Sequence, residues 1–186
     1  MGPVFEPVAT DAQVAELAGA ADRIWHDYWP ALIGEEQTDY MVEMMLSPEA
    51  IRRETAREGY RYWLVRDAGR LAGFLGVRAE RLEPGERGLS AAVDARWRRR
   101  LFVSKVYLDA WARGRHLGSR MLDFCEGLCL EEGLEAMYLQ VMRDNELGVR
   151  CYAGRGFEVV EDLDTDRGGG HVMRDHIMAK EVARLR

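Results

Sequence analysis

The feature that most constrains the fold is the alternation of strand and helix patterns in the second half of the chain. Short apolar runs at 101–108 and 134–142 are typical of strands. Each run is followed by a segment of helical period, 117–133 after the first and ELGVRCYAG after the second. A strand, a helix and another strand in this order form a crossover unit, which favours an α/β fold.

The flanking segments add further strands. YRYWLVRDAGRLAGFLGVRAE contains two strand-like runs around Asp67–Arg70, which predicts a hairpin. FEVVEDL and HVMRDHIMAKEV predict two final strands. Together with the crossover units, these strands predict a mixed sheet flanked by helices.

The N-terminal part is mainly helical. Residues 4–9 read as a short edge strand, and Thr10 with Gln13 forms a capping-box signature. A helix is expected from Asp11, a second over 35–46, and a third in SPEAIRRETAREG. No repeat or linker interrupts the chain, so we expect one domain over its 186 residues.

Charge and composition exclude some classes of function. The formal net charge of −6 disfavours nucleic-acid binding. The basic run RWRRR, residues 96–100, is interpreted as a solvated edge next to a strand. No signal peptide or membrane-length apolar run is visible, which predicts a cytoplasmic protein with no membrane partner. Cys125 and Cys129 are four residues apart in a helical pattern and are expected to pack in the core.

The stretch YLDAWARGRHLGSRML, residues 107–122, joins a strand to a helix. Gly114 and Gly118 allow a close approach of the backbone, and Arg113, Arg115 and Arg120 add positive charge. A helix N-terminus behind such a loop suits an anion such as a phosphate. The spacing matches neither the Rossmann fingerprint nor the Walker loop. A glycine-bearing turn with solvated arginines is the equally weighted alternative.

A second stretch, RDNELGVRCYAGRGFEVV, favours the binding interpretation. Asn145 can cap a helix, Tyr152 follows two turns later, Gly156 ends the helix and Phe157 opens the next strand.

Together the two stretches resemble the GCN5-related N-acetyltransferase (GNAT) family. The family's acyl-CoA motif, apolar-Tyr-apolar and then Arg/Gln-x-x-Gly-x-Gly/Ala, is similar to Val106, Tyr107 and Leu108 followed by 113–118. Its second motif, Asn, Tyr seven residues later and Gly-Phe, is similar to the run from Asn145 to Phe157. The resemblance covers roughly residues 60–180. It implies a mostly antiparallel sheet of about seven strands with splayed central strands.

One position departs from the motif, because His116 replaces the usual first glycine. If that position requires a positive φ, histidine tolerates it less well than glycine. We expect CoA binding to remain intact.

The resemblance implies acetyl-CoA as cosubstrate and assigns its binding residues. These are Val106, Tyr107, Leu108, Arg113, Gly114, Arg115, His116, Leu117, Gly118, Ser119, Asn145 and Tyr152. No metal is expected, since the histidines show no ligand spacing.

The resemblance also assigns catalytic roles. Tyr152 holds the position of the family's general acid, and Ser104 stands where the family often carries a glutamate base. Glu36, with Glu35 and Asp39 nearby, offers an alternative carboxylate, although a solvated helix start is the preferred interpretation of each.

An acceptor pocket is expected near the N-terminal helices. Four aromatic residues are candidates to line it and to hold a cation, and core packing is the alternative for each: Trp25, Tyr28, Trp29 and Tyr40.

The predicted function is acetyl-CoA-dependent N-acetylation of a primary amine. The amine is expected to belong to a small molecule, for which a polyamine is one possibility. A peptide or protein amine, or a non-catalytic acyl-CoA-binding module, are the alternatives. A homodimer is compatible with the sequence.

Overall fold

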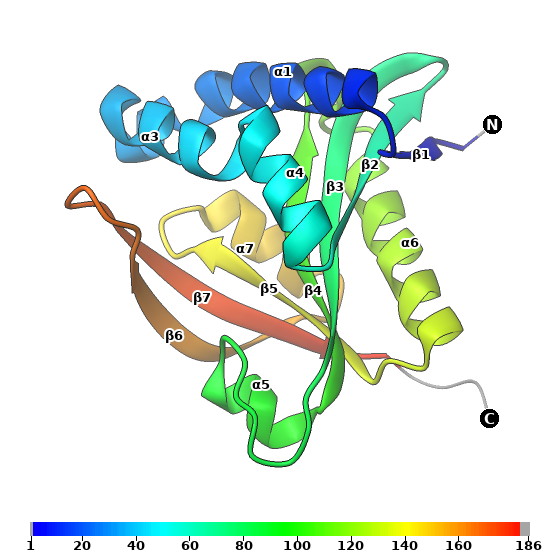
Figure 1. Cartoon of the computed structure of the whole chain (residues 1–186), viewed down its shortest axis with the longest axis vertical. Coiled ribbons are helices and arrows are strands. Elements are labelled where there is room, and N and C mark those ends of the chain that lie inside the picture. Colours follow the sequence, from blue (N-terminus) through cyan, green and yellow to red (C-terminus); the bar gives the residue numbers. More distant parts are fainter. Residues whose placement is uncertain (1, 183–186) are drawn as a thin grey trace. The chain divides into compact units, whose positions relative to one another are not determined.

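The computed structural model describes residues 2–182 and contains a seven-stranded sheet with helices (Figure 1). Its elements include the predicted ones in the predicted order, together with three short helices that were not predicted, α2, α5 and η1. The elements are β1 Val4–Pro7, α1 Asp11–Tyr28, α2 Pro30–Ile33, α3 Glu35–Leu46, α4 Pro48–Arg57, β2 Tyr60–Asp67, β3 Arg70–Arg81, α5 Ala91–Arg96, β4 Arg99–Leu108, the 3₁₀ helix η1 Ala110–Ala112, α6 Leu117–Glu132, β5 Ala136–Met142, α7 Glu146–Ala153, β6 Glu158–Asp166 and β7 Val172–Glu181.

The sheet is open and mixed, with the strand order β1-β2-β3-β4-β5-β7-β6. β4 and β5 run parallel, whereas the pairs β1–β2, β2–β3, β5–β7 and β6–β7 are antiparallel. The parallel pairing joins Arg100–Phe102 to Ala136–Tyr138, at the beginning of both strands. The predicted mixed, mostly antiparallel sheet is confirmed.

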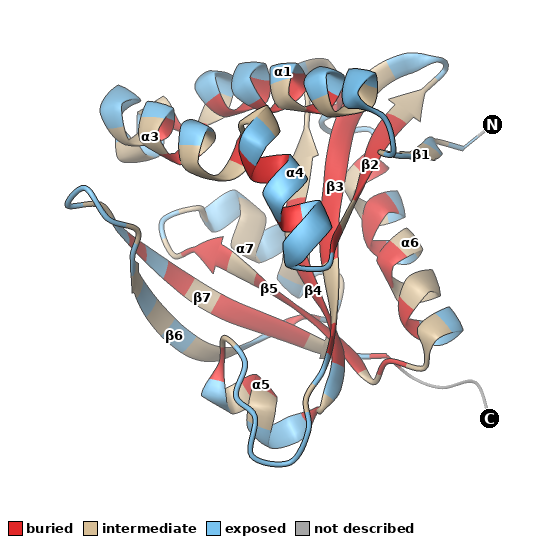
Figure 2. Cartoon of the chain, in the orientation of Figure 1, coloured by how far each residue is buried: buried red, intermediate tan, exposed pale blue. Residues whose placement is uncertain are grey.

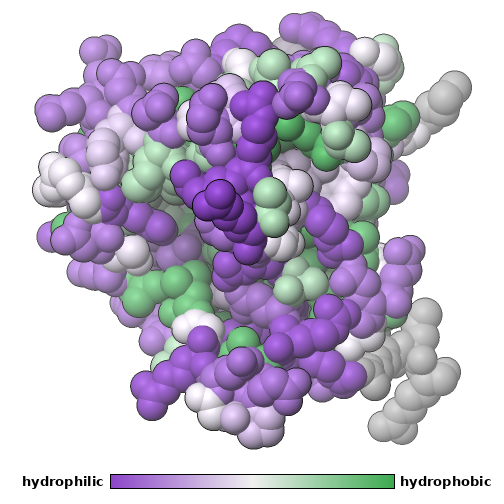
Figure 3. All heavy atoms as spheres, viewed as in Figure 1, coloured by the Kyte–Doolittle hydropathy of each residue, from purple (hydrophilic) through white to green (hydrophobic). Residues whose placement is uncertain are grey.

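The chain divides into two compact units, residues 2–78 with 105–122 and residues 79–104 with 123–182. In both units the buried residues lie mainly on the strands and in patches along the helices (Figure 2). Hydrophilic side chains cover most of the face shown in Figure 3, as expected for a chain with 31% charged residues. No helix among residues 2–182 is long and apolar enough to cross a membrane.

In the first unit, α1 begins as its sequence predicts. The Thr10 side chain accepts from Gln13 N, and the Gln13 side chain accepts from Thr10 N, which completes the capping box. Apolar residues recur at helical spacing and are buried, among them Leu17, Ala21 and Ile24.

The predicted hairpin joins β2 to β3 through a two-residue turn. Asp67 pairs with Arg70, and the two residues between them have positive φ, 49° at Ala68 and 79° at Gly69. This is the pattern of a type I′ turn, which favours Asn or Gly at both positions. Ala68 is therefore held in a strained conformation.

We expect Ala68→Asn to raise the free energy of unfolding by about 0.5–1.5 kcal/mol, because asparagine tolerates the left-handed region better than alanine. Gly69→Ala should lower the free energy of unfolding. Nothing lies within 4 Å of the new Cβ, so the substitution adds only the strain of a left-handed backbone at alanine. Urea denaturation of both variants measures the two signs. Equal effects of the two substitutions would contradict the turn assignment.

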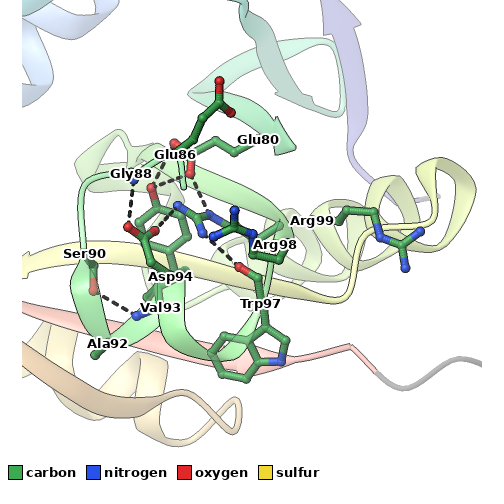
Figure 4. A network of polar contacts seen from close by, with 12 residues as sticks. Glu80, Glu86, Gly88, Ser90, Ala92, Val93, Asp94, Trp97, Arg98 and Arg99 are labelled. Atoms are coloured by element: carbon green, nitrogen blue, oxygen red, sulfur yellow. Dashed lines mark hydrogen bonds and ion pairs between the residues drawn. The ribbon is translucent and has the colours of Figure 1, made fainter. Parts of the chain in front are cut away.

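The second unit corrects one prediction. RWRRR was expected to be a solvated edge, but Arg100 is 0% exposed. Its guanidinium donates to Glu80 Oε2 at 2.8 Å, to Asp94 Oδ1 at 2.6 Å and to the carbonyl of Trp97 at 2.8 Å (Figure 4). Burial alone would lower the pKa of Arg100, but its hydrogen bonds to Glu80 and Asp94 raise it. The basic run therefore supplies a buried ion-pair network.

The same unit buries the two helix cysteines. Cys125 and Cys129 are both 0% exposed and form no disulfide, as predicted for core residues. Burial raises the pKa of the Cys125 thiol above its usual range, so the thiol stays protonated and unreactive.

Candidate active site

The strand-to-helix connection lies entirely in the first unit and begins at a close backbone approach. A Cβ at Gly73 of β3 would lie 2.1 Å from the carbonyl oxygen of Tyr107 on β4, so only glycine fits there. After Leu108 the chain turns through η1, and Ala72, Ala112 and Leu117 form a small buried cluster beneath the loop. This cluster fixes the start of α6 against the end of β4.

Two residues of the loop have left-handed backbone conformations. The φ angles are 73° at Gly114 and 60° at His116. The glycine position of the family motif therefore does require a positive φ in this chain, and His116 adopts it. Since a non-glycine residue holds this conformation only against a steric cost of about 1–2 kcal/mol, the surrounding structure must impose it.

The N-terminus of α6 is open to an anion. The hydrogen bond from Arg120 N to the carbonyl of His116 is 3.2 Å long, and the N–H groups of 117–119 precede it. These N–H groups have no carbonyl one turn earlier to bond within the helix. A Cβ at Gly118 would meet only Leu108 Cδ1, at 3.9 Å, so the backbone is uncovered there. The positive end of a 16-residue helix is thus accessible to a phosphate.

The three arginines of this stretch differ in their ion-pair partners. Arg113 pairs with Asp27 at 3.0 Å and also donates from Nε to the carbonyl of Leu108. Arg115 pairs with Asp67 at 3.0 Å. Both ion pairs are part-exposed, and such pairs contribute little to stability, so either arginine can exchange its carboxylate for a phosphate. Arg120 is exposed and makes no ion pair within residues 2–182.

The second motif lies in the second unit, where Asn145 caps α7 as predicted. Its side-chain oxygen accepts from Gly148 N at 3.0 Å. Tyr152 is half-buried, and its ring meets Phe157 edge-on at 5.9 Å. Burial, then the nearby thiols of Cys151 and Cys125, raise the pKa of the Tyr152 phenol. The phenol is therefore protonated at neutral pH, as a general acid must be.

Comparison with known proteins decides the family. The model of the acetyltransferase (GNAT) family matches residues 21–157, well over half of the chain. The chain belongs to the GNAT acetyltransferase family. The N-acetyltransferase predicted from its two motifs is thereby confirmed at the level of the family.

Solved structures share the fold of this GNAT chain. They include the PaiA N-acetyltransferase from Thermoplasma acidophilum in complex with coenzyme A, at 19% identity and a TM-score of 0.70, covering 97% of this chain and 99% of that one. A GCN5-related N-acetyltransferase from Rhodopseudomonas palustris has 14% identity and a TM-score of 0.71, covering 97% and 96%. YncA from Salmonella typhimurium, with its cofactor acetyl-CoA, has 15% identity and a TM-score of 0.60, covering 100% and 96%. The comparison with curated proteins found no match.

The predicted acceptor aromatics of the GNAT chain divide into two groups. Trp25 and Trp29 are 1% and 7% exposed and stack on each other at 5.0 Å, which is core packing. Tyr28 is half-buried, and the guanidinium carbon of Arg113 lies over its ring, 5.3 Å from the ring centroid. Tyr40 is also half-buried. Trp25 further contacts Tyr107 of β4 at 5.5 Å between ring centroids. The two tyrosines are therefore better placed to meet a ligand than the two tryptophans.

The predicted base candidates lie in different units. Ser104 is half-buried on β4 in the second unit. Glu36 is exposed in the first turn of α3 in the first unit, as a solvated helix start would be. Asp39 accepts from His26 Nε2 at 2.7 Å, and this bond is the main cause that raises the pKa of His26.

Two buried acidic residues did not stand out in the sequence. Glu54 of α4 accepts from Lys105 Nζ at 3.0 Å and from the Tyr62 hydroxyl. Asp175 of β7 lies between the buried Met173 and Ile177 on an inward-facing row. The alternation Met173, Asp175, Ile177 was the available signal, because an acid on the apolar face of a strand is unusual. Among the described residues, no three His, Cys, Asp or Glu side chains are grouped to hold a metal ion.

Proposed function

We propose that the chain transfers the acetyl group of acetyl-CoA to a primary amine of a small molecule. The observation that supports this proposal is the uncovered N-terminus of α6 at Gly118. The loop that leads to it contains two residues with left-handed backbone conformations. The presence of coenzyme A in the PaiA structure and of acetyl-CoA in the YncA structure, both with the same fold, supports this cosubstrate.

The diphosphate of CoA would rest on the loop at 113–119, held by main-chain N–H groups. Arg120 is available to a phosphate, and Arg113 and Arg115 can join it by leaving their carboxylates. The pantetheine arm would pair with the last residues of β4, Val106 to Leu108, as an added strand does. Asn145 and Tyr152 complete the proposed cofactor residues.

The chemistry needs a base, an acid and a site for the developing negative charge. An alkylamine has a pKa near ~10, so it must lose a proton before it attacks the thioester carbonyl. The main-chain N–H of Leu108 would stabilise the oxyanion. The departing thiolate, with a pKa near ~8.5 if it resembles cysteine, would take a proton from the Tyr152 phenol. Ser104 or Glu36 would serve at the base position through a water.

The net charge of −6 favours a cationic acceptor, which includes polyamines. We further propose a single domain, a cytoplasmic location and, as one oligomeric state to test, a homodimer.

The test combines acetyl-CoA with a panel of amines, including spermidine, ethylamine and a lysine-containing peptide, and measures the thiol released. Turnover of a small amine supports the proposal, and preference for the peptide would move the acceptor class to proteins. Thermal stabilisation by CoA without turnover of any amine would instead identify a binding module. No stabilisation and no turnover would contradict the function.

Gly118 supplies a sharper test of the cofactor site. We expect Gly118→Ala to weaken CoA binding at least tenfold, because the new methyl group lies where the diphosphate meets the backbone. Gly127→Ala is the matched control in the same helix, since nothing lies within 4 Å of its Cβ. Both changes add similar helix propensity. Isothermal titration with CoA measures the difference, and equal affinities of the two variants would refute this placement.

A further inference from the structure

The inference concerns two arginines that lie over one tryptophan in the first unit. The guanidinium carbon of Arg70 is 4.1 Å from the centroid of the Trp111 ring, and that of Arg115 is 5.4 Å from it. Arg70 is the first residue of β3, whereas Trp111 and Arg115 belong to the connection between β4 and α6. Asp67, the last residue of β2, pairs with Arg115 at 3.0 Å. We call these four residues the arginine–tryptophan cluster.

The fold brings the β2–β3 turn and this connection together. Asp109 N donates to the carbonyl of Ala72 at 2.9 Å, which holds the end of β4 beside the beginning of β3. Arg70 and Ala72 are two residues apart on one strand, so they share a face of the sheet. Ala72 belongs to the small buried cluster beneath the loop, and Trp111 packs against that cluster. Arg70 therefore lies on the face of β3 that meets the start of α6.

The side chain of Arg70 has unused hydrogen-bond donors. The residue is exposed, and within residues 2–182 it forms no ion pair and donates no side-chain hydrogen bond. A guanidinium that stacks on an aromatic ring keeps its five N–H donors around its edge. Trp111 Nε1 is buried, so the polar edge of the indole points away from solvent. The ring thus supports the guanidinium of Arg70 and leaves its donors to a ligand.

The cluster carries more positive charge than it neutralises. Two guanidinium groups lie over one ring, and the single ion pair within the cluster joins Arg115 to Asp67. Neighbouring like charges repel each other, and an anion between them removes that cost. A phosphate monoester has a charge of about −2 near pH 7 and three acceptor oxygens, which suits two guanidinium groups. The cluster therefore has the chemistry of a phosphate subsite.

A second stacked arginine in the chain shows what packing alone looks like. Arg96, also exposed, lies over Trp97 with its guanidinium carbon 4.3 Å from the ring centroid. Among the described residues, no other arginine lies over that ring. The arginine–tryptophan cluster differs because it holds two cations and because Arg115 also belongs to the loop at 113–119.

We propose that Arg70 and Arg115, supported by Trp111, bind the 3′-phosphate on the ribose of CoA. The proposal rests on the proposed function, in which the main-chain N–H groups of the loop at 113–119 hold the diphosphate. In CoA a single ribose joins the diphosphate to the 3′-phosphate, so a diphosphate on this loop brings the second phosphate group close to Arg115. No covalent bond changes at this subsite. It contributes affinity, and it selects CoA over dephospho-CoA, which lacks only the 3′-phosphate.

The experiment compares CoA with dephospho-CoA by isothermal titration at an ionic strength of about 50 mM, because salt screens exposed charges. We expect the wild type to bind CoA about tenfold more tightly than dephospho-CoA. Arg70→Gln should weaken CoA binding about five- to tenfold and leave the affinity for dephospho-CoA within about twofold of the wild type. The matched control, Arg96→Gln, removes a stacked arginine of the same kind and should leave both affinities within about twofold. The melting temperatures of both variants should stay close to that of the wild type.

Three results would overturn the proposal. The first, which needs no variant, is equal affinity of the wild type for the two nucleotides. The second is an equal loss of both affinities in Arg70→Gln, which would indicate a general effect of charge or folding. The third is binding of inorganic phosphate that requires Arg70 but gives CoA no advantage, which would assign the cluster to a free phosphate. Failure of the proposed function looks different, since the wild type would then bind neither nucleotide, or would prefer CoA and acetylate no amine.

Discussion

Tyr152→Phe should slow acetyl transfer by about 10²- to 10⁴-fold while leaving acetyl-CoA affinity within about threefold of the wild type. The substitution removes only the hydroxyl, which in the proposed mechanism gives its proton to the departing thiolate. Burial and the neighbouring thiols raise the phenol's pKa, so the proton is present across the neutral range. The measurement is kcat for thiol release at saturating acetyl-CoA and amine, with the cofactor affinity determined separately.

The Phe variant is its own structural control. The edge-on contact between residue 152 and Phe157 does not use the hydroxyl, so the melting temperature should change little. A variant with kcat close to the wild type would remove Tyr152 from the mechanism. A variant that loses acetyl-CoA binding along with activity would show that the Tyr152 hydroxyl is needed to bind the cofactor, and would contradict its proposed role as the acid.

Arg100→Met should lower the free energy of unfolding by about 3–5 kcal/mol, the largest stability effect that we expect for a single charge removal in this chain. The substitution leaves Glu80 and Asp94 buried without their cation. The Tyr138 hydroxyl would still donate to Glu80 at 3.0 Å, which retains one partner for one of the two carboxylates. Chemical denaturation followed by circular dichroism measures the change.

The neighbouring Arg99 provides the matched control. Its side chain is 45% exposed and pairs with Glu135 at 2.9 Å. Because exposed ion pairs contribute about 0–1 kcal/mol, Arg99→Met should have a small effect. If the two substitutions destabilise the chain equally, the buried network is not what holds α5 and the loop around it to the sheet.

The order of the strands and long helices could be predicted because they carry local signals, whereas the short helices α2 and α5 were not predicted. Thr10 and Gln13 mark the start of α1, Asn145 marks the start of α7, and the residues around Gly69 specify the hairpin turn. The motif position of His116 raised the question of a positive φ, which the backbone at His116 adopts. These features depend on residues within a few positions of one another, so a single sequence contains the information.

The burial of charge could not be predicted in the same way. The run RWRRR has the composition of a solvated segment, and Arg100 is buried because Glu80, 20 residues earlier, and Asp94 meet its guanidinium. Asp175 and Thr165 become neighbours on one face only through the register of β6 with β7. A charge is stable in the interior only when its partners are placed by the fold, and these partners lie far apart in sequence.

The central claim is that the main-chain N–H groups at the start of α6 bind the diphosphate of coenzyme A. A crystal structure of the chain grown with coenzyme A tests it most directly. We expect diphosphate oxygens at about 2.7–3.2 Å from main-chain nitrogens of residues 114–119, with the backbone of His116 still left-handed. A nucleotide bound elsewhere, with this helix start empty, would contradict the account.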